Sequence, residues 1–385
     1  MTLPGAAGQA FVYSASVLYD REVRVVFGPG TLTRVAPEAR ALGTSILLIS
    51  GCHEAEAADA VSAQLGDDLA SRIEGVHPHV PVGVASRATA VAREVGAGVV
   101  VAIGGGSAVG LAKAVALDTG LPIVAVPTTY AGSEMTPVWG KSDASGKTTG
   151  RDARVQPAVV VYDPLLTVSM PIDLSAASGM NALAHAIEAL YAPDTTSTST
   201  AVAEEAIATL AHALPRVVGQ PGDMEARTRA LRGAWLAGWS LSINTMGLHH
   251  KLAHVLGGTF QLWHAGVHSA LLPQVAAFNV PSARTAFDRA AHALGVGGPE
   301  AVPHALFALV RQVGAPSSLA SLGLDARALD AVDWIAAVGT VANPRAITET
   351  DLTDVVQRTW RGEEPQPDIG TDANAPTQYQ GGTSS

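Results

Sequence analysis

Histidines cluster in the second half of the chain at spacings that place their side chains on common helix faces. Five of the twelve histidines fall between residues 249 and 268. His250 and His254 are four residues apart, as are His264 and His268, and residues at this spacing share one face of a helix. Histidine is the commonest imidazole metal ligand and titrates near neutral pH without perturbation. The cluster therefore indicates a metal site or an acid–base site, while satisfied polar contacts between packed helices are the structural alternative.

Another histidine, His185, lies at helical spacing from a polar side chain. Asn181 and His185 are four residues apart in the segment GMNALAHAIEALY, which begins at residue 179. Both therefore lie on one face of a predicted helix. We expect this face to meet the other histidines in one cleft.

A glycine-rich turn in the first half has the parts of an anion site. The apolar run 99–103 predicts a buried strand, and Gly104, Gly105 and Gly106 follow it directly. Glycines let the backbone approach a phosphate, and the first N–H groups of a helix lack internal partners. Ser107 opens a helical pattern and is the predicted N-cap.

A second predicted strand strengthens the nucleotide interpretation. The run 123–126 leads into Thr128 and Thr129, and Ser133 follows a glycine soon after. Hydroxyls at the end of one strand, beside a glycine turn at the end of another, are typical of a nucleotide site at the carboxyl ends of parallel strands. The GGGS turn alone matches neither the dinucleotide fingerprint nor a P-loop, so a plain tight turn remains its alternative.

Short apolar runs alternate with helical patterns through the first half, which predicts a parallel sheet in a three-layer α/β fold. Predicted strands fall at 11–27 (two strands and a turn), 45–49, 72–76, 99–103, 123–126 and 158–162, and predicted helices at 31–42, 54–65, 86–95 and 107–117. Residues 141–155 are polar and predict a hairpin.

Long Ala- and Leu-rich helical patterns dominate from residue 175 onward. They predict helices at 200–217, 224–242, 247–257 and 282–294. We therefore expect an α/β domain over 1–174 and an all-helical domain over 175–361. Residues 362–385 are polar and rich in Pro, Gly, Gln and Thr, which is typical of a disordered tail.

Composition narrows the partners and the compartment. The chain has 385 residues, a formal net charge of −10 and scattered Lys and Arg, which argues against a nucleic-acid partner. We see no run of roughly 18 apolar residues, so we expect no membrane span. Cys52 is the single cysteine, and the N-terminus resembles no signal peptide, which favours the cytoplasm.

Several of these motifs together resemble one known family. The GGGS turn and the segments PTTYAGSEMTP, GMNALAHAIEALY and GLHHKLAH are similar, in wording and order, to the iron-containing alcohol dehydrogenase family, and most similar to its maleylacetate reductase branch. The resemblance covers nearly all of residues 11–361. It implies a dehydroquinate synthase-like architecture, with a Rossmann-like dinucleotide-binding domain, a helical catalytic domain and a cleft between them. It also implies NADH or NADPH as cofactor and a homodimer.

The metal site of the family falls, by this resemblance, on Asn181, His185, His250 and His264. Metal-binding members have an aspartate at the first position, whereas this chain has a neutral amide. Losing a carboxylate should weaken binding of a divalent metal, so we expect no metal. Were a metal present, its ligands would be His185, His250 and His264, since three histidines and water suffice for zinc.

The cofactor side is carried over in the same way. The resemblance implies that Gly104, Gly105, Gly106 and Ser107 hold the diphosphate, and that Thr128, Thr129 and Ser133 line the cofactor. Gly110 stands where many metal-dependent members have aspartate. Gly51 follows the strand 45–49, where an acidic residue would favour the free ribose 2′-hydroxyl of NADH. With no acid at Gly51, we expect no enforced preference between the two cofactors.

The chemistry implied by the reductase branch is hydride addition to the double bond of maleylacetate, with charge building on the carbonyl oxygen. Without a metal, imidazoles must donate to that oxygen. His250 and His254 are the first candidate catalytic residues, followed by His185 and His264. The predicted substrate-binding residues are Asn181, Lys251 and Arg151, although the two cations are equally interpretable as surface charges.

The chain also departs from the branch near the cleft. Trp263 precedes His264 where we expect proline, and Ala265, Gly266 and Val267 separate His264 from His268 where we expect an acidic residue and a threonine. Gln274 stands where histidine is frequent. The alternatives are therefore a metal-dependent alcohol or aldehyde dehydrogenase, or a relative recruited to another enone or a specialised biosynthetic step. A non-redox protein on the same scaffold is a third hypothesis.

Overall fold

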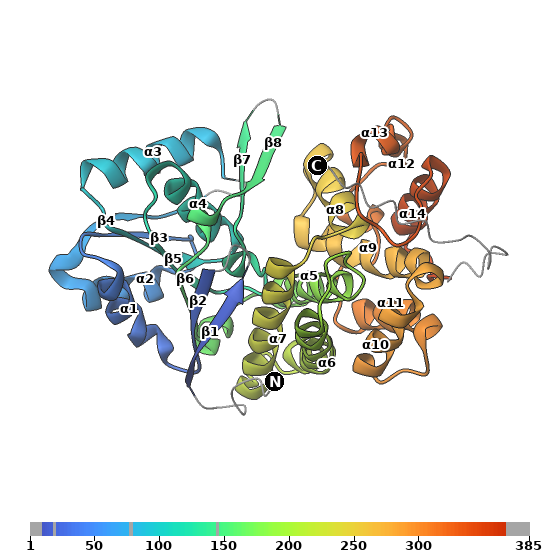
Figure 1. Cartoon of the computed structure of the whole chain (residues 1–385), viewed down its shortest axis with the longest axis horizontal. Coiled ribbons are helices and arrows are strands. Elements are labelled where there is room, and N and C mark those ends of the chain that lie inside the picture. Colours follow the sequence, from blue (N-terminus) through green and yellow to red (C-terminus); the bar gives the residue numbers. More distant parts are fainter. Residues whose placement is uncertain (1–9, 18–20, 77–79, 144–145, 367–385) are drawn as a thin grey trace, which may run out of the picture.

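The computed structural model describes residues 10–17, 21–76, 80–143 and 146–366. An α/β half and a helical half lie side by side along the longest axis (Figure 1). The predicted fold class is confirmed. Residues 367–385, which hold most of the predicted tail, lie outside the described residues.

A seven-stranded sheet forms the centre of the α/β half. Its order is β1-β2-β9-β6-β5-β3-β4, with β1 antiparallel to β2 and every other neighbouring pair parallel. The strands are β1 (Phe11–Val17), β2 (Arg21–Phe27), β3 (Ile46–Ser50), β4 (Leu69–Ile73), β5 (Val99–Gly104), β6 (Ile123–Pro127) and β9 (Val159–Tyr162). A separate hairpin, predicted from residues 141–155, is formed by β7 (Val138–Asp143) and β8 (Gly146–Arg151).

Helices cover both faces of this sheet because its strands are apolar on both faces. Val99, Val101 and Ile103 of β5 share a core with α1 (Val35–Leu42) and α2 (Ala55–Leu65). Val100 and Ala102, which point the other way, share a core with α3 (Val82–Glu94) and α4 (Gly106–Thr119).

Several predicted boundaries were wrong, and two of these errors in the α/β half have a local cause. The strand predicted at 72–76 begins at Leu69, because the 3₁₀ turn Gly66–Asp68 leads straight into it. The helix predicted at 86–95 begins at Val82, directly after Pro81, whose extended backbone precedes the first turn.

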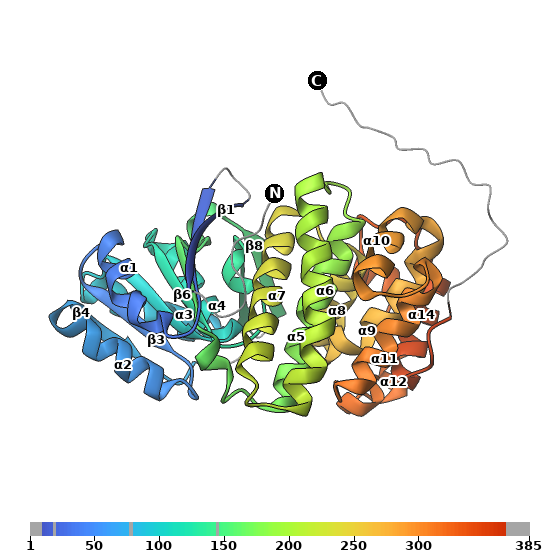
Figure 2. The same cartoon turned by 90° about the horizontal axis from the view of Figure 1, so that it is seen from below.

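The helical half packs its helices against one another and against the sheet (Figure 2). Its helices are α5 (Ile172–Leu190), α6 (Ser197–Gly219), α7 (Met224–Ile243), α8 (Leu248–Thr259), α9 (His264–Asn279), α10 (Arg284–Leu294), α11 (Val302–Gln312), α12 (Ala326–Leu329), α13 (Trp334–Val338) and α14 (Glu349–Arg361). The expected boundary between residues 174 and 175 therefore falls inside the first turn of α5.

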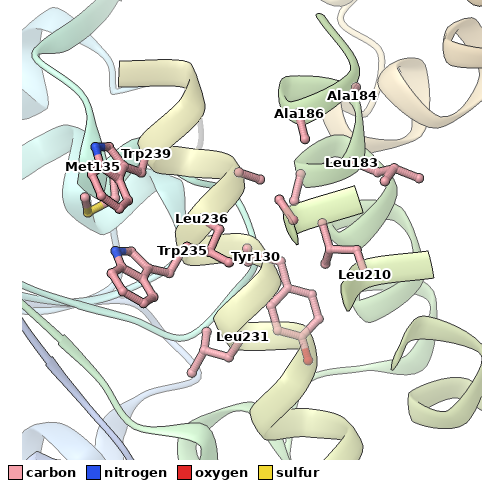
Figure 3. Close-up of a cluster of buried hydrophobic side chains, with 14 of the residues drawn as sticks. Tyr130, Met135, Leu183, Ala184, Ala186, Leu210, Leu231, Trp235, Leu236 and Trp239 are labelled. Atoms are coloured by element: carbon pink, nitrogen blue, oxygen red, sulfur yellow. The ribbon is translucent and has the colours of Figure 1, made fainter. Parts of the chain in front are cut away.

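Aromatic side chains on α7 join the two halves. Trp235 and Trp239 stack with ring centroids 6.2 Å apart, and Phe11 and Tyr13 of β1 pack against them. Figure 3 shows both indoles on the side of α7 near Met135, with Leu183 of α5 on its other side. The continuous core fixes α5 and α7 relative to the end of the sheet.

None of the described helices alone is long and apolar enough to cross a membrane. A bent pair, α10 with the stretch Pro299–Gln312, meets that test by length and composition only.

Candidate active site

One face of α5 carries three buried polar side chains. Asn181, His185 and Glu188 follow one another at spacings of four and three residues, and each is at most 5% exposed. The amide oxygen Oδ1 of Asn181 is buried without a hydrogen-bond partner in the described part of the chain. An unpaired buried oxygen is costly, so this face is suited to receive a polar ligand.

The carboxylate of Glu188 fixes the start of α8 above this face. Its Oε1 accepts the backbone N–H of His249 at 2.8 Å, and its Oε2 contacts Nδ1 of His250. A carboxylate is stabilised at a helix N-terminus by the free N–H groups and the helix dipole. Glu188 therefore positions α8 and the imidazole of His250 together.

His185 and His250 form a hydrogen-bonded pair between α5 and α8. Nδ1 of His185 lies 2.6 Å from Nε2 of His250, and the rings stack with centroids 4.8 Å apart. On the far sides, Nε2 of His185 donates to the carbonyl oxygen of Ala131 at 3.2 Å, and Nδ1 of His250 donates to Glu188. Two neutral rings would then face each other with lone pairs, so the contact requires one additional proton.

That proton belongs on His250, beside the carboxylate. The pKa of His185 is held well below its usual value, first by burial and then by the positive charge of His250. His185 is therefore neutral, and its Nδ1 accepts from Nε2 of His250, whose Nδ1 contacts Glu188. The two rings thus share one hydrogen bond in a buried site.

A second set of histidines continues from this pair. Nε2 of His249 lies 2.9 Å from Nδ1 of His268, and Nε2 of His268 lies 3.2 Å from Nε2 of His264. The ring of His268 is 4.9 Å from that of His250, and burial lowers the pKa of both His249 and His268. His254 is exposed one turn beyond His250, with its ring stacked 5.6 Å from that of His264.

The loop after β6 reaches the histidines from the α/β half. Ala131 accepts from His185, and Gly132 has a φ of 77°. A Cβ on Gly132 would lie 3.2 Å from the backbone of Gly238 on α7 and 3.3 Å from the His185 ring. The loop thus needs glycine to pass between α7 and the imidazole.

The glycine turn lies where β5 ends and α4 begins. Gly105 is the N-cap without a side-chain cap, so the prediction that Ser107 is the N-cap was wrong; the helix begins at Gly106, one residue earlier. Gly106 is exposed, and a Cβ on Gly105 would lie 3.0 Å from the side chain of Thr129. The backbone of this turn is therefore exposed to solvent at Gly106.

Other residues predicted on the cofactor side have structural contacts. Gly110 allows α4 to approach Val80, since a Cβ there would lie 2.9 Å from it. The carbonyl oxygen of Ser133 accepts from the buried ammonium of Lys113 at 2.6 Å. Thr128 donates to Glu54 at 2.9 Å.

No acid stands at Gly51 itself, but a carboxylate lies beside it. Although Gly51 has no side chain, the space beside it holds the carboxylate of Glu54: a Cβ on Gly51 would lie 2.2 Å from Oε2 of that residue. The carboxylate beside Gly51 therefore belongs to Glu54, three residues further along the chain.

The predicted substrate-binding cations lie in different settings. Lys251 is half-buried on α8, directly after His250, while Arg151 is exposed at the end of β8.

Trp263 is exposed at the start of α9, and Gln274 is buried and donates to the carbonyl oxygen of Glu363 at 2.6 Å. Gln274 thus holds the segment after α14.

Comparison with known families agrees with these features. Residues 22–164 match the model described as iron-containing alcohol dehydrogenase, and residues 175–360 match that of the C-terminal region of the same family. The chain belongs to the iron-containing alcohol dehydrogenase family. It is an oxidoreductase, and the family is nicotinamide-dependent.

Similar proteins place it within the family. The chain is 46% identical to the maleylacetate reductase of Sphingobium indicum over 89% of this chain and 96% of the relative. It is 43% identical to that of Burkholderia cepacia, over 92% and 99%. The crystal structure of maleylacetate reductase from Agrobacterium tumefaciens superimposes with a TM-score of 0.84 at 39% identity, over 92% and 99%. The resemblance to the maleylacetate reductase branch is confirmed.

The residues at the metal positions of the family do not fit a metal as they are arranged. Ligand nitrogens at 2.0–2.1 Å from a tetrahedral zinc ion stand about 3.3 Å apart. The 2.6 Å between His185 and His250 is instead a hydrogen-bond distance, and His264 contacts His268. Within the described residues, no group of three or more His, Cys, Asp or Glu side chains forms a metal-binding arrangement.

Proposed function

We propose that this family member reduces maleylacetate, or a similar oxo-enoate, to the saturated oxo-acid (3-oxoadipate from maleylacetate), with NADH or NADPH as the hydride source. The relatives named maleylacetate reductase support the substrate class. The observation that carries the chemistry is the 2.6 Å contact between Nδ1 of His185 and Nε2 of His250 in a buried site. A reduction that places charge on a carbonyl oxygen needs such a proton donor.

The chain's own residues divide the work between the α/β half and the helical half. The turn Gly104–Gly106 and the first N–H groups of α4 hold the diphosphate, with Thr128, Thr129 and Ser133 beside it. When bound, the nicotinamide supplies the hydride. His250, held by Glu188 through Nδ1, donates from Nε2 to the carbonyl oxygen of the substrate in place of Nδ1 of His185, and His185 orients His250 before the substrate binds.

Substrate carboxylates need cations and amides close to that oxygen. Lys251 follows His250 on α8, and Asn181 lies one helical turn before His185. We propose that these two bind carboxylates, that Arg151 contributes only long-range attraction, and that His254 and His264 line the entrance. His254 is exposed, so its loss should reduce activity less than the loss of His250.

We also propose that the reaction proceeds without a metal. The neutral amide at Asn181 and the direct contact between His185 and His250 support this. A metal-dependent alcohol or aldehyde dehydrogenase is the main alternative, and recruitment to another biosynthetic enone is a narrower variant. We further propose a cytoplasmic homodimer that acts on a small oxo-acid, with neither nucleic acid nor membrane as partner.

The test combines turnover and metal analysis of the purified chain. We expect maleylacetate to drive NADH or NADPH oxidation at 340 nm, before and after dialysis against a chelator, with less than stoichiometric iron or zinc. Absence of turnover with either dinucleotide would overturn the proposed function. Stoichiometric metal whose removal abolishes turnover would favour the alternative.

A further inference from the structure

Glu54 stands at the point where three strands end. Its Oε1 accepts from Thr128 after β6 at 2.9 Å, and its Oε2 accepts the backbone N–H of His53 after β3 at 3.2 Å. The carboxyl carbon would lie 3.6 Å from a Cβ on Gly104, at the end of β5. The carboxylate therefore lies next to the glycine turn, at the carboxyl edge of the sheet.

Gly51 and Glu54 form a matched pair. A side chain at Gly51 would force the carboxylate to move, since a Cβ there would lie 2.2 Å from Oε2. Because Gly51 has no side chain, the space at the end of β3 can hold the carboxylate of Glu54. Glu54 is only half-buried, so the residue is not enclosed in the core.

The position has a defined meaning in dinucleotide-binding sheets. The diphosphate lies on the glycine turn, and the adenosine ribose lies beyond the end of the neighbouring strand, where an acid accepts from its hydroxyls. In this chain the turn follows β5, and β3 is its neighbour in the sheet. The acid at the end of β3 is Glu54.

We propose that Glu54 makes the enzyme selective for NADH over NADPH. Its carboxylate accepts from the ribose 2′-hydroxyl of NADH and repels the 2′-phosphate of NADPH. The inference rests on the proposed function, because it assigns one residue to the cofactor that this function uses. A purely structural role, in which Glu54 only supports Thr128, is the competing explanation.

Binding measurements without substrate separate these explanations. We would titrate NADH, NADPH, ADP-ribose and its 2′-phosphate into the protein by calorimetry at low salt. The wild type should bind each 2′-hydroxyl ligand on the order of tenfold more tightly than its 2′-phosphate counterpart. In Glu54→Gln this ratio should fall close to one, mainly because the 2′-phosphate ligands bind more tightly.

Two further variants serve as controls. Glu56→Gln removes an exposed carboxylate two residues away on α2 and should keep the wild-type ratio. Thr128→Val removes the hydroxyl that Glu54 accepts from, and it should weaken both dinucleotides alike while keeping the ratio.

Three outcomes would overturn the inference. They are equal affinity of the wild type for NADH and NADPH, a ratio unchanged in Glu54→Gln, and equal weakening of both ligands by that variant. These results would leave the proposed function intact, whereas failure of every dinucleotide to bind would overturn both.

Discussion

Nδ1 of His185 lies 2.6 Å from Nε2 of His250, and each ring uses its other nitrogen on a fixed acceptor, Ala131 or Glu188. Neither imidazole can change its tautomer without breaking a contact of the other. The pair therefore behaves as one unit with one proton between its two rings. It also links the loop after β6 to the start of α8.

Replacing the two histidines should show strongly non-additive effects. His185→Gln and His250→Gln should each lower kcat/KM by roughly 10² to 10³, because each removes the shared proton from its position. The kcat/KM of the double variant should be at most about threefold lower than that of the less active single variant. Steady-state kinetics on all four proteins measures the coupling. Multiplicative losses would show that the rings act independently.

Glu188→Gln tests the carboxylate that contacts His250. The amide is similar in size but carries no charge, so His250 loses its negatively charged neighbour while the contact with the His249 N–H is kept. We expect kcat to fall about 10²-fold, with KM within a few-fold. Glu94→Gln, exposed at the end of α3, is the matched control and should retain wild-type kinetics. A loss expressed only in KM would assign Glu188 to substrate binding instead.

The strands at the centre of the sheet were predictable because their signal is local. β5 and β6 are short β-branched runs followed by glycine or hydroxyl residues, and both lie where the sequence indicates. β4 was misplaced because it is the edge strand, half-buried throughout, and its apolar pattern is weak. The start of α3 was hidden by Val82 and Gly83, which are poor helix formers.

The candidate site was predictable only as far as helical spacing extends. Spacing placed His250 and His254 on one face, but only the first turn of α8 is buried against α5, so His254 is exposed. Glu188 lies seven residues after Asn181, on the face that the sequence already marked, and this spacing could have identified it. The contact between His185 and His250 joins helices far apart in sequence, which no local pattern encodes.

Asn181→Asp should move the site toward a metal. The new carboxylate supplies the oxygen ligand that metal-binding members have, so we expect at least tenfold tighter zinc binding. The added negative charge should also raise KM for a dicarboxylate substrate about tenfold. Asn181→Ala separates the added charge from the lost amide. Metal content after dialysis against buffered zinc, together with KM, checks both effects; no change in zinc affinity would refute the first.

Lys113 gives a pH dependence of stability whose sign is fixed. Burial lowers its pKa from 10.5 to about 7, opposed by Glu134. Between these values the unfolded chain holds the proton and the folded chain does not, so the free energy of unfolding rises with pH, by at most about 1.4 kcal/mol per unit. Lys113→Met lacks this slope, although it also loses bonds to Ser133, Thr136 and Val138. Urea unfolding of the wild type and of Lys113→Met at pH 7.5 and 9.5 measures how each free energy of unfolding changes with pH. Equal changes in the two proteins would mean that the ammonium of Lys113 stays charged in the folded chain.

Gly132→Ala tests how closely the loop after β6 must approach His185, and Gly120→Ala is its matched control. The two glycines have φ of 77° and 76°, but the space around a Cβ on Gly120 is open, whereas one on Gly132 meets Gly238 and His185. Left-handed backbone should cost each variant about 1 kcal/mol of stability. The crowding should cost Gly132→Ala about 1–3 kcal/mol more. Because the crowding also pushes on the imidazole, only Gly132→Ala should lose kcat. Equal stability and equal kcat in the two variants would show that this contact does not position His185.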